Sequence, residues 1–397
     1  MHRVGIGSMK YMGHKGKLLP VLGEILIHES RNASSIADPF CGSGAVSWFL
    51  ATQTDKIVIS GDLQSFAVAR AASVTERTES VDSAALLKQW SKDAHAVIEQ
   101  ITSQFPNAER SIDPRHVTAE DIRYVVSRSR TFCEAVLPPV LNRLNSSFPM
   151  TRAYGGHYFS PLQAIELDAL RQTIPQHPAL RRAALGALVE TASKCAASPG
   201  HTAQPFQPTE SAAKYILEAW NRNVWSLLEQ SVNSICSSFA RKKGSAEIGD
   251  FKDCISKLGE GDLVFADPPY SDVHYSRFYH VLETLTVGRE VNVAGTGRYP
   301  PFADRPASDF SRKGKAKLAA KALIDSCIQS RTNLVLTFPH DGASNGLTTG
   351  DFIALAEGKF SAVETHQVTS QFSTLGGNVG TRGGRKECTE SIVCFRH

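Results

Sequence analysis

The apolar runs at the two ends of the chain constrain its fold more than any other feature of the sequence. They are short, lack polar alternation, and occupy about residues 34–38, 56–62, 262–266, 333–337, 360–368 and 390–395. Such runs are typical of strands covered on both faces, as in a mostly parallel sheet. Helical patterns at 44–51 and 65–73 follow the first two runs. The ends of the chain therefore predict an α/β sheet with helices on both faces.

The middle of the chain has a different pattern. From about residue 81 to 239 helical periodicity dominates, and we expect helices over 83–103, 119–129, 161–173, 178–197 and 210–240. This stretch is long enough to be domain-sized. We therefore expect a large, mainly helical insertion that interrupts the sheet, with limits at 1–78, 79–244 and 245–397.

Composition excludes several classes of protein. The 397 residues carry a formal net charge of +4 with both signs nearly balanced, which excludes a polycation or an acidic tail. No apolar run could span a membrane, and the N-terminus lacks the apolar core of a signal peptide. The eight cysteines are scattered and form no CxxC pair, which indicates reduced thiols and no metal site. These features predict a soluble, cytoplasmic protein without a bound metal.

A glycine-rich turn, Asp38-Pro-Phe-Cys-Gly-Ser-Gly44, follows the first predicted strand. Gly42 and Gly44 would let the backbone turn tightly beside a ligand, and the next helix would point its free N–H groups there. The turn is not a GxGxxG fingerprint. Asp62, at the end of the second predicted strand, is placed to accept hydrogen bonds from ribose hydroxyls. The alternative is an ordinary strand–turn–helix connection without a ligand.

The tetrad Asp267-Pro-Pro-Tyr270 comes directly after a buried apolar run. A carboxylate and a proline carbonyl, such as that of Pro268, can accept both N–H bonds of a nucleobase amine and direct its lone pair at an electrophilic methyl group. Pro269 removes a second backbone donor. Tyr270 would stack on a base extruded from a duplex. The alternative is a rigid surface turn.

The order of these motifs resembles the Dam-type adenine-specific DNA methyltransferases, which use S-adenosylmethionine. The resemblance rests on Lys10-Tyr-Met-Gly13, the turn at 38–44 and the tetrad at 267–270, and the segment 385–393 resembles the family's final strand. It implies a Rossmann-like methyltransferase sheet and catalytic roles for Asp267, Pro268, Pro269 and Tyr270. The implied cofactor residues are Lys10, Tyr11, Asp38, Phe40, Gly42, Gly44, Asp62, Asp250 and Phe251.

Within that resemblance, Lys10 and Tyr11 would face the methionine moiety, Asp38 its amino group and Asp62 the ribose. Asp250 and Phe251 would border the adenine of the cofactor.

Two features depart from the family pattern. The gap between Asp62 and Asp267 exceeds that of compact members, so we assign target recognition to the helical insertion. The segment 273–283, after the tetrad, is rich in aromatic and polar residues. It is expected either to line the pocket for a flipped base or to form a partly buried amphipathic helix, with one face carrying Tyr275, Tyr279, His280 and Glu283.

Positive charge is concentrated after the tetrad. Residues 298–321 hold seven basic and two acidic side chains, and phosphate contacts are the expected use. A solvated helix face is the alternative. Weaker candidates are 198–206 and 241–243 in the insertion. The residues predicted to contact DNA are Arg298, Arg305, Arg312, Lys313, Lys315, Lys317, Arg382 and Arg385.

The predicted activity is methyl transfer to the N6 amino group of a flipped adenine in double-stranded DNA. Cytosine-N4 methylation, an RNA substrate, and an inactive DNA-binding subunit of a modification or defence system remain alternatives. A cognate restriction or defence protein is a candidate partner.

Overall fold

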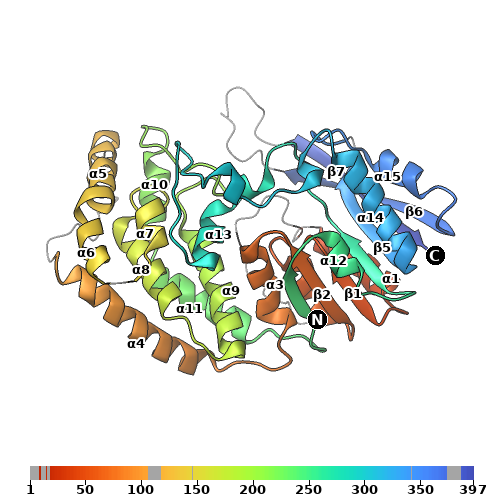
Figure 1. Cartoon of the computed structure of the whole chain (residues 1–397), viewed down its shortest axis with the longest axis horizontal. Coiled ribbons are helices and arrows are strands. Elements are labelled where there is room, and N and C mark those ends of the chain that lie inside the picture. Colours follow the sequence, from red (N-terminus) through yellow and green to blue (C-terminus); the bar gives the residue numbers. More distant parts are fainter. Residues whose placement is uncertain are drawn as a thin grey trace.

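A seven-stranded sheet lies in the right half of the molecule in Figure 1. The structure is a computed structural model that describes residues 9, 15, 18–105, 118–144, 146–340, 342–372 and 386–397. The strand order is β3-β2-β1-β4-β5-β7-β6; β7 pairs antiparallel with β5 and with β6, and the other neighbouring pairs are parallel. The strands are β1 (Ser35–Asp38), β2 (Ile57–Asp62), β3 (Ser245–Ile248), β4 (Leu263–Ala266), β5 (Asn333–Pro339), β6 (Ala362–Phe372) and β7 (Lys386–Arg396).

All six predicted strands are present, and the α/β fold class is confirmed. The additional strand, β3, is four residues long, lies at the sheet edge and is nowhere fully buried. A short, half-polar edge strand leaves no continuous apolar run, so the sequence pattern could not reveal it.

Side chains that alternate along the strands cover both faces of the sheet. Ile36, Val58 and Phe265 pack with α1 (Leu19–Glu29) and α2 (Ala45–Gln53). Their sequence neighbours Ala37, Ile59 and Val264 belong to the cluster on the opposite face. That face is covered by α12 (Phe251–Ile255), α14 (Ala316–Ser330) and α15 (Thr349–Ala356). Burial on both faces explains the continuous apolar runs.

A helical body fills the other half of the molecule (Figure 1). It consists of α4 (Ser83–Thr102), α5 (Ala119–Thr131), α6 (Pro138–Arg143), α7 (Pro149–Tyr154), α8 (Pro161–Gln172), α9 (Pro178–Cys195), α10 (Ala213–Trp220), α11 (Val224–Cys236) and α13 (His280–Val287), with a π-helix at Phe132–Val136. The helical pattern predicted over 210–240 is interrupted, because Asn223 accepts a hydrogen bond from the Ser226 amide and begins α11 anew.

The helical body and the sheet domain share one apolar core. A single cluster joins Trp48 and Phe66 with side chains of α4, α8, α9, α11 and α13. α3 (Ser65–Thr75) packs on α9, where Arg70 pairs with Glu190 at 2.9 Å and both side chains are 1% exposed. Arg70 Nη1 also donates to the Gly186 carbonyl at 3.0 Å. The domain limits 1–78, 79–244 and 245–397 stay a prediction, and the helices pack directly on the sheet domain.

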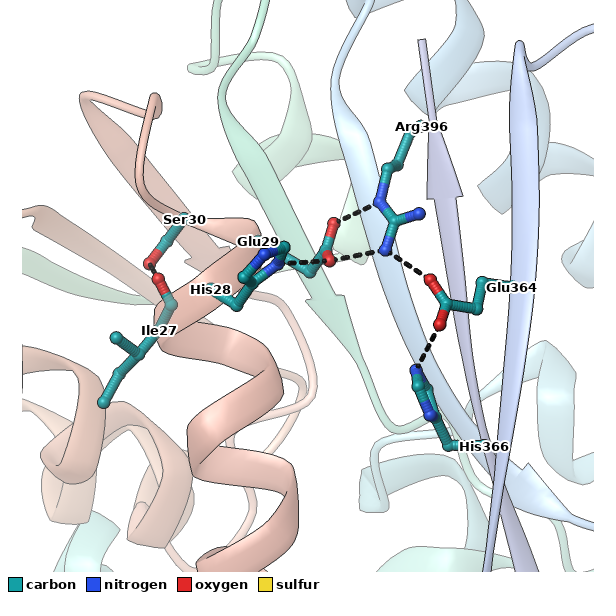
Figure 2. Close-up of polar contacts among 7 residues, drawn as sticks. All are labelled: Ile27, His28, Glu29, Ser30, Glu364, His366 and Arg396. Atoms are coloured by element: carbon teal, nitrogen blue, oxygen red, sulfur yellow. Dashed lines mark hydrogen bonds and ion pairs between the residues drawn. The ribbon is translucent and has the colours of Figure 1, made fainter.

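An ion-pair network ties α1 to the antiparallel edge of the sheet (Figure 2). Arg396 on β7 donates from Nε and Nη2 to both carboxylate oxygens of Glu29, at 2.8 and 2.7 Å, and from Nη2 to Glu364 on β6 at 2.7 Å. His366 lies 3.4 Å from Glu364. The hydrogen bonds from Arg396 lower the pKa of Glu29. This network holds the end of the chain against the first helix.

Three further observations concern the described residues only. Seven cysteines are free and buried: Cys41, Cys133, Cys195, Cys236, Cys254, Cys327 and Cys394. None of the helices in the described ranges is both long and apolar enough to cross a membrane. Within the same ranges, no group of three His, Cys, Asp or Glu side chains is arranged to hold a metal ion.

Candidate active site

A cavity of about 260 Å³ opens at the carboxyl ends of β1, β2 and β4. It lies where the chain order reverses, because β2 follows β1 on one side while β4 pairs with β1 on the other. Such switch points are the usual ligand sites of open α/β sheets. The cavity is lined by the glycine-rich turn, by Asp62, by Asp250–Phe251 and by the whole 267–270 tetrad. The two motifs, more than 200 residues apart in the sequence, therefore share one site.

Hydrogen bonds hold the glycine-rich turn against the end of β2. The Cys41 amide donates to the Gly61 carbonyl at 3.0 Å, and the Gly42 amide donates to Asp62 Oδ2 at 3.0 Å. Gly42 and Gly44 have φ of 48° and 78°, which only glycine adopts without strain. A Cβ on Gly44 would also lie 3.3 Å from backbone atoms of α3. The turn therefore needs glycine for its shape and for its contact with α3.

Asp38 is a buried carboxylate with one oxygen left open. Its Oδ2 accepts a 2.6 Å hydrogen bond from Ser47 Oγ, whereas Oδ1 is buried and has no partner among the described residues. Burial raises the pKa of Asp38 to about 7, and the nearby carboxylates of Asp267 and Asp62 add to the increase. A buried acceptor without a donor is costly. An ammonium group entering the cavity would supply the missing donor.

Asp62 and three aromatic rings form the adjoining wall. Burial raises the pKa of Asp62 to about 6, although the amides of Gly42 and Gln64 donate to its carboxylate and act in the opposite direction. Phe40 stacks on Phe251 with centroids 5.9 Å apart, and Phe310 meets Phe40 edge-on at 5.6 Å. Carboxylate and rings together suit a ribose joined to a flat base.

Asp250 lies at the same wall but has a structural contact as well. It begins α12, where its Oδ1 accepts from the Lys252 amide at 3.2 Å.

Asp267 is held through one carboxylate oxygen. Thr337 Oγ1 donates to Oδ1 at 2.8 Å, and Lys15 Nζ lies 3.0 Å from the same atom. Oδ2 has no hydrogen-bond partner within the described ranges and remains as an acceptor for a ligand. The Pro269 carbonyl accepts from Asn345 Nδ2 at 3.2 Å, which leaves the Pro268 carbonyl as the candidate acceptor of the tetrad backbone.

Tyr270 also lines the cavity and meets Phe338 edge-on at 6.4 Å. Its ring is therefore supported by Phe338 at the cavity wall.

Sequence reasoning missed Lys15, Thr337, Phe310 and Glu390. Lys15 is buried between Asp267 and Glu390, which is 6% exposed on β7. Burial works to lower the pKa of Lys15, but the two carboxylates outweigh it and raise the pKa. Its position five residues after Lys10, within the same N-terminal segment, could have marked Lys15 as a candidate site residue. The pairing with Glu390, 375 residues away, carries no signal in the sequence pattern.

The segment after the tetrad divides its predicted residues between two roles. Tyr275 lines the cavity. Tyr279 is fully buried, and both ring nitrogens of His280 lie about 3 Å from backbone carbonyls. Glu283 accepts from the amides of Ser65 at 3.0 Å and Phe66 at 3.1 Å, and so caps α3. Of the four residues on the predicted helical face, only Tyr275 borders the cavity.

The residues predicted to contact DNA differ in their exposure and in how strongly the protein itself binds their charged groups. Arg298 donates to the carbonyls of Ala153 and Arg152 and to Glu134, so its guanidinium is bound within the protein. Lys317 is 72% exposed and pairs with Asp351 at 3.3 Å. Lys315 and Arg312 pair with Asp309 at 3.4 and 3.8 Å. Also partly or fully exposed are Arg305, Arg312, Lys313 and Lys315.

Some predicted residues cannot be placed at the site. Lys10, Tyr11, Arg382 and Arg385 lie outside the described residues. The weaker candidate 241–243 lies just before β3, at the amino end of the sheet and away from the cavity. The loop 198–206 is different, because the Thr202 amide donates to the Phe278 carbonyl at 2.7 Å, next to the cavity wall.

Residues 11–335 match a protein family described as D12 class N6 adenine-specific DNA methyltransferase. A modification methylase of Streptococcus sanguinis, StsI, is 25% identical to this chain over 126 residues. The matched segment covers 32% of this chain and 18% of that relative. The chain thus spans less than a fifth of the length of the relative it matches.

Proposed function

This chain belongs to the D12 class N6 adenine-specific DNA methyltransferase family, and on that premise we propose that it transfers a methyl group from S-adenosylmethionine to the N6 amino group of an adenine in double-stranded DNA. The observation that carries the proposal is one cavity lined by both Asp38 and Asp267. Asp38 Oδ1 is buried without a partner among the described residues, and Asp267 is held through Oδ1 alone in those same residues. A cofactor cradle and an amine acceptor are the two parts that this reaction needs.

The cradle fits the cofactor group by group. Asp38 Oδ1 would accept from the ammonium of the methionine moiety, and Asp62 from the ribose hydroxyls. The rings of Phe40, Phe251 and Phe310 would enclose the adenine. When bound, S-adenosylmethionine supplies an electrophilic methyl group. Roles for Lys10 and Tyr11 at the methionine moiety remain part of the proposal.

The tetrad would bind the amine of a flipped base. Asp267 Oδ2 and the Pro268 carbonyl accept its two N–H bonds, which favours a lone pair directed at the methyl group. Lys15 and Thr337 hold Oδ1 and thereby fix the orientation of the carboxylate. Asp267 stabilises positive charge that develops on the nitrogen. The methylated amine is acidic and sheds its proton readily, so no strong base is required.

Duplex DNA would lie over the mouth of the cavity, with the helical body contributing target recognition. Arg305, Arg312, Lys313, Lys315 and Lys317 are the basic side chains that we assign to phosphate contacts. We leave Arg298 out of this set because two backbone carbonyls and Glu134 bind its guanidinium, whereas Arg312, Lys315 and Lys317 each make one exposed ion pair. The similarity to a modification methylase supports a place in a restriction–modification or defence system, and we propose that the protein acts in the cytoplasm.

Long-read sequencing tests the proposal. DNA from cells that express the wild type should carry N6-methyladenine in one sequence context, and DNA from cells that express Asp267→Ala should lack it. Detection of N4-methylcytosine in the DNA would show that the substrate is cytosine, and modification of RNA alone would show that it is RNA. Cofactor binding by purified protein without any modified nucleic acid would instead indicate an inactive subunit.

A further inference from the structure

One aromatic side chain, in the loop between two cavity-lining segments, is largely exposed to water. Phe302 is 62% exposed, the highest exposure of any aromatic side chain in the part of the chain that the structure describes. It begins a single 3₁₀ turn, Phe302–Asp304, directly after Pro300 and Pro301. Two prolines before the turn restrict the backbone. The ring is therefore presented by a stiff segment.

The ring is supported from behind by a stack of rings and cations. His274 meets Phe302 edge-on at 4.9 Å, and the Arg305 guanidinium lies 5.3 Å from the Phe302 centroid. Arg305 also lies 5.6 Å from the ring of Tyr299, against which Arg277 packs at 4.9 Å. These contacts cover part of the Phe302 ring, and 62% of the residue stays exposed.

Tyr299 anchors this stack to the helical body. Its hydroxyl accepts from Arg277 Nε at 2.7 Å and donates to the Ala203 carbonyl. Tyr299 also exchanges backbone hydrogen bonds with Ala294, at 2.9 and 3.0 Å. The segment around Tyr299 and Phe302 is thus joined through Ala203 to the loop 198–206 of the insertion, and through His274 to the segment that lines the cavity.

Cavity-lining residues lie on both sides of Phe302. Pro306 and Ser308 follow it in the chain, and Tyr275 and Ser276 follow His274, the residue that its ring touches. Phe302 does not itself line the cavity. It lies between two segments that line the cavity containing Asp267.

We propose that Phe302 enters the DNA duplex at the target site and stacks on the bases left behind when the adenine turns into the cavity, with Arg305 as the cation that faces the adjoining phosphate. The proposal rests on the proposed function. An extruded base leaves unstacked neighbours, and a flat apolar ring restores the stacking that they lost. Arg305 is partly buried, forms no ion pair with any described residue, and its Nε is buried without a hydrogen-bond partner there, so a DNA phosphate would supply the missing counter-charge.

The test compares substrates that differ only in the cost of base extrusion. One duplex carries the target context, found by sequencing, with a fully paired adenine, and the other has an abasic site opposite that adenine. Phe302→Ala should lower kcat/KM on the paired duplex by about 10- to 100-fold, in proportion to one lost stacking contact. On the abasic duplex it should stay within about threefold of the wild type, because the adenine has no pairing partner there and its extrusion costs less.

Three controls separate this role from a structural one. Phe302→Trp keeps a flat ring and should retain activity on the paired duplex. Phe239→Ala removes an aromatic side chain that is 40% exposed and does not line the cavity. It should leave kcat/KM unchanged on both duplexes. S-adenosylmethionine binding and thermal unfolding of Phe302→Ala should match the wild type.

Equal losses on both duplexes, or no loss on the paired duplex, would overturn the proposal. A wild type that modifies no DNA is a separate result that refutes the proposed function. The sequencing of wild-type and Asp267→Ala cells detects it before any Phe302 variant is made.

Discussion

Replacing Asp38 with asparagine should stabilise the fold and weaken cofactor binding, because the two effects come from the same buried charge. Asp38 is 1% exposed and its Oδ1 has no donor among the described residues. Asparagine has the same shape, keeps an oxygen for the Ser47 hydroxyl and removes the negative charge. The substitution thus isolates the charge from the packing.

The expected gain in stability follows from the pKa. Burial raises the pKa of Asp38 from 3.8 to about 7, so the ionised carboxylate costs the folded state about 4 kcal/mol at pH 8. The buried amide group of Asp38→Asn would lack an acceptor, which destabilises the folded variant by about 1–3 kcal/mol and offsets part of the gain. The free energy of unfolding of Asp38→Asn without cofactor should therefore exceed that of the wild type by about 1–3 kcal/mol at pH 8.

The sign of the pH dependence gives a second check. Because the folded pKa of Asp38 lies above the unfolded one, this group makes the wild type lose stability as the pH rises from about 4 to about 7. At pH 5 folded Asp38 is protonated, and its cost falls to about 2 kcal/mol. The advantage of Asp38→Asn should shrink by about 2–3 kcal/mol between pH 8 and pH 5.

Cofactor affinity should change in the opposite direction. A charge-assisted hydrogen bond to the ammonium is worth about 1.5–3 kcal/mol, which corresponds to a loss of about 10- to 100-fold in affinity for Asp38→Asn by calorimetry. Wild-type affinity should weaken as the pH falls through 7, since protonated Asp38 loses its charge, and the variant should depend less on pH. Asp272→Asn, the same change at an exposed site near the tetrad, serves as the control.

Parallel stability profiles of wild type and Asp38→Asn between pH 5 and pH 8 would refute the buried-charge reasoning. Cofactor affinity of Asp38→Asn equal to that of Asp272→Asn would remove Asp38 from the cofactor site while leaving the stability argument intact.

Three further substitutions test the site and its surroundings. Gly44→Ala places a Cβ at a φ of 78° and 3.3 Å from the α3 backbone. Urea unfolding should show that the free energy of unfolding falls by about 1–3 kcal/mol, and cofactor affinity should fall as well. An unchanged urea midpoint would contradict the backbone conformation assigned to Gly44. Glu283→Ala removes the carboxylate that caps α3, so thermal unfolding should reveal a loss of about 1–2 kcal/mol; no loss would show that the cap contributes little. Lys317→Ala should lower the slope of log affinity against log salt for DNA by about one, and an unaltered slope would exclude a phosphate contact at this exposed side chain.

Local features of the sequence were enough to predict the strands, the glycine turn and the tetrad. Each depends on neighbours in the chain: a run such as Leu263–Ala266 is apolar because both of its faces are covered, and Gly44 is required by its own φ. The same reasoning failed for β3, whose pairing with β2 leaves no apolar run, and for Glu283, whose partners are the amides of Ser65 and Phe66 more than 200 residues earlier. Contacts of that range follow from how helices pack, which a local pattern does not record.

The sequence by itself determined that this protein has a sheet covered on both faces, with a glycine-rich turn after one strand and the 267–270 tetrad after another. Only the tertiary structure decided that these parts form one site. Pairing of β4 with β1 brings Asp267 beside Asp38, and the return of β7 brings Glu390 onto Lys15. The position of Phe302 beside two cavity-lining segments depends likewise on the contacts of Arg305 with Tyr299 and Phe302. Strand order and burial bring together charges that are distant in the chain, and these are properties of the folded core.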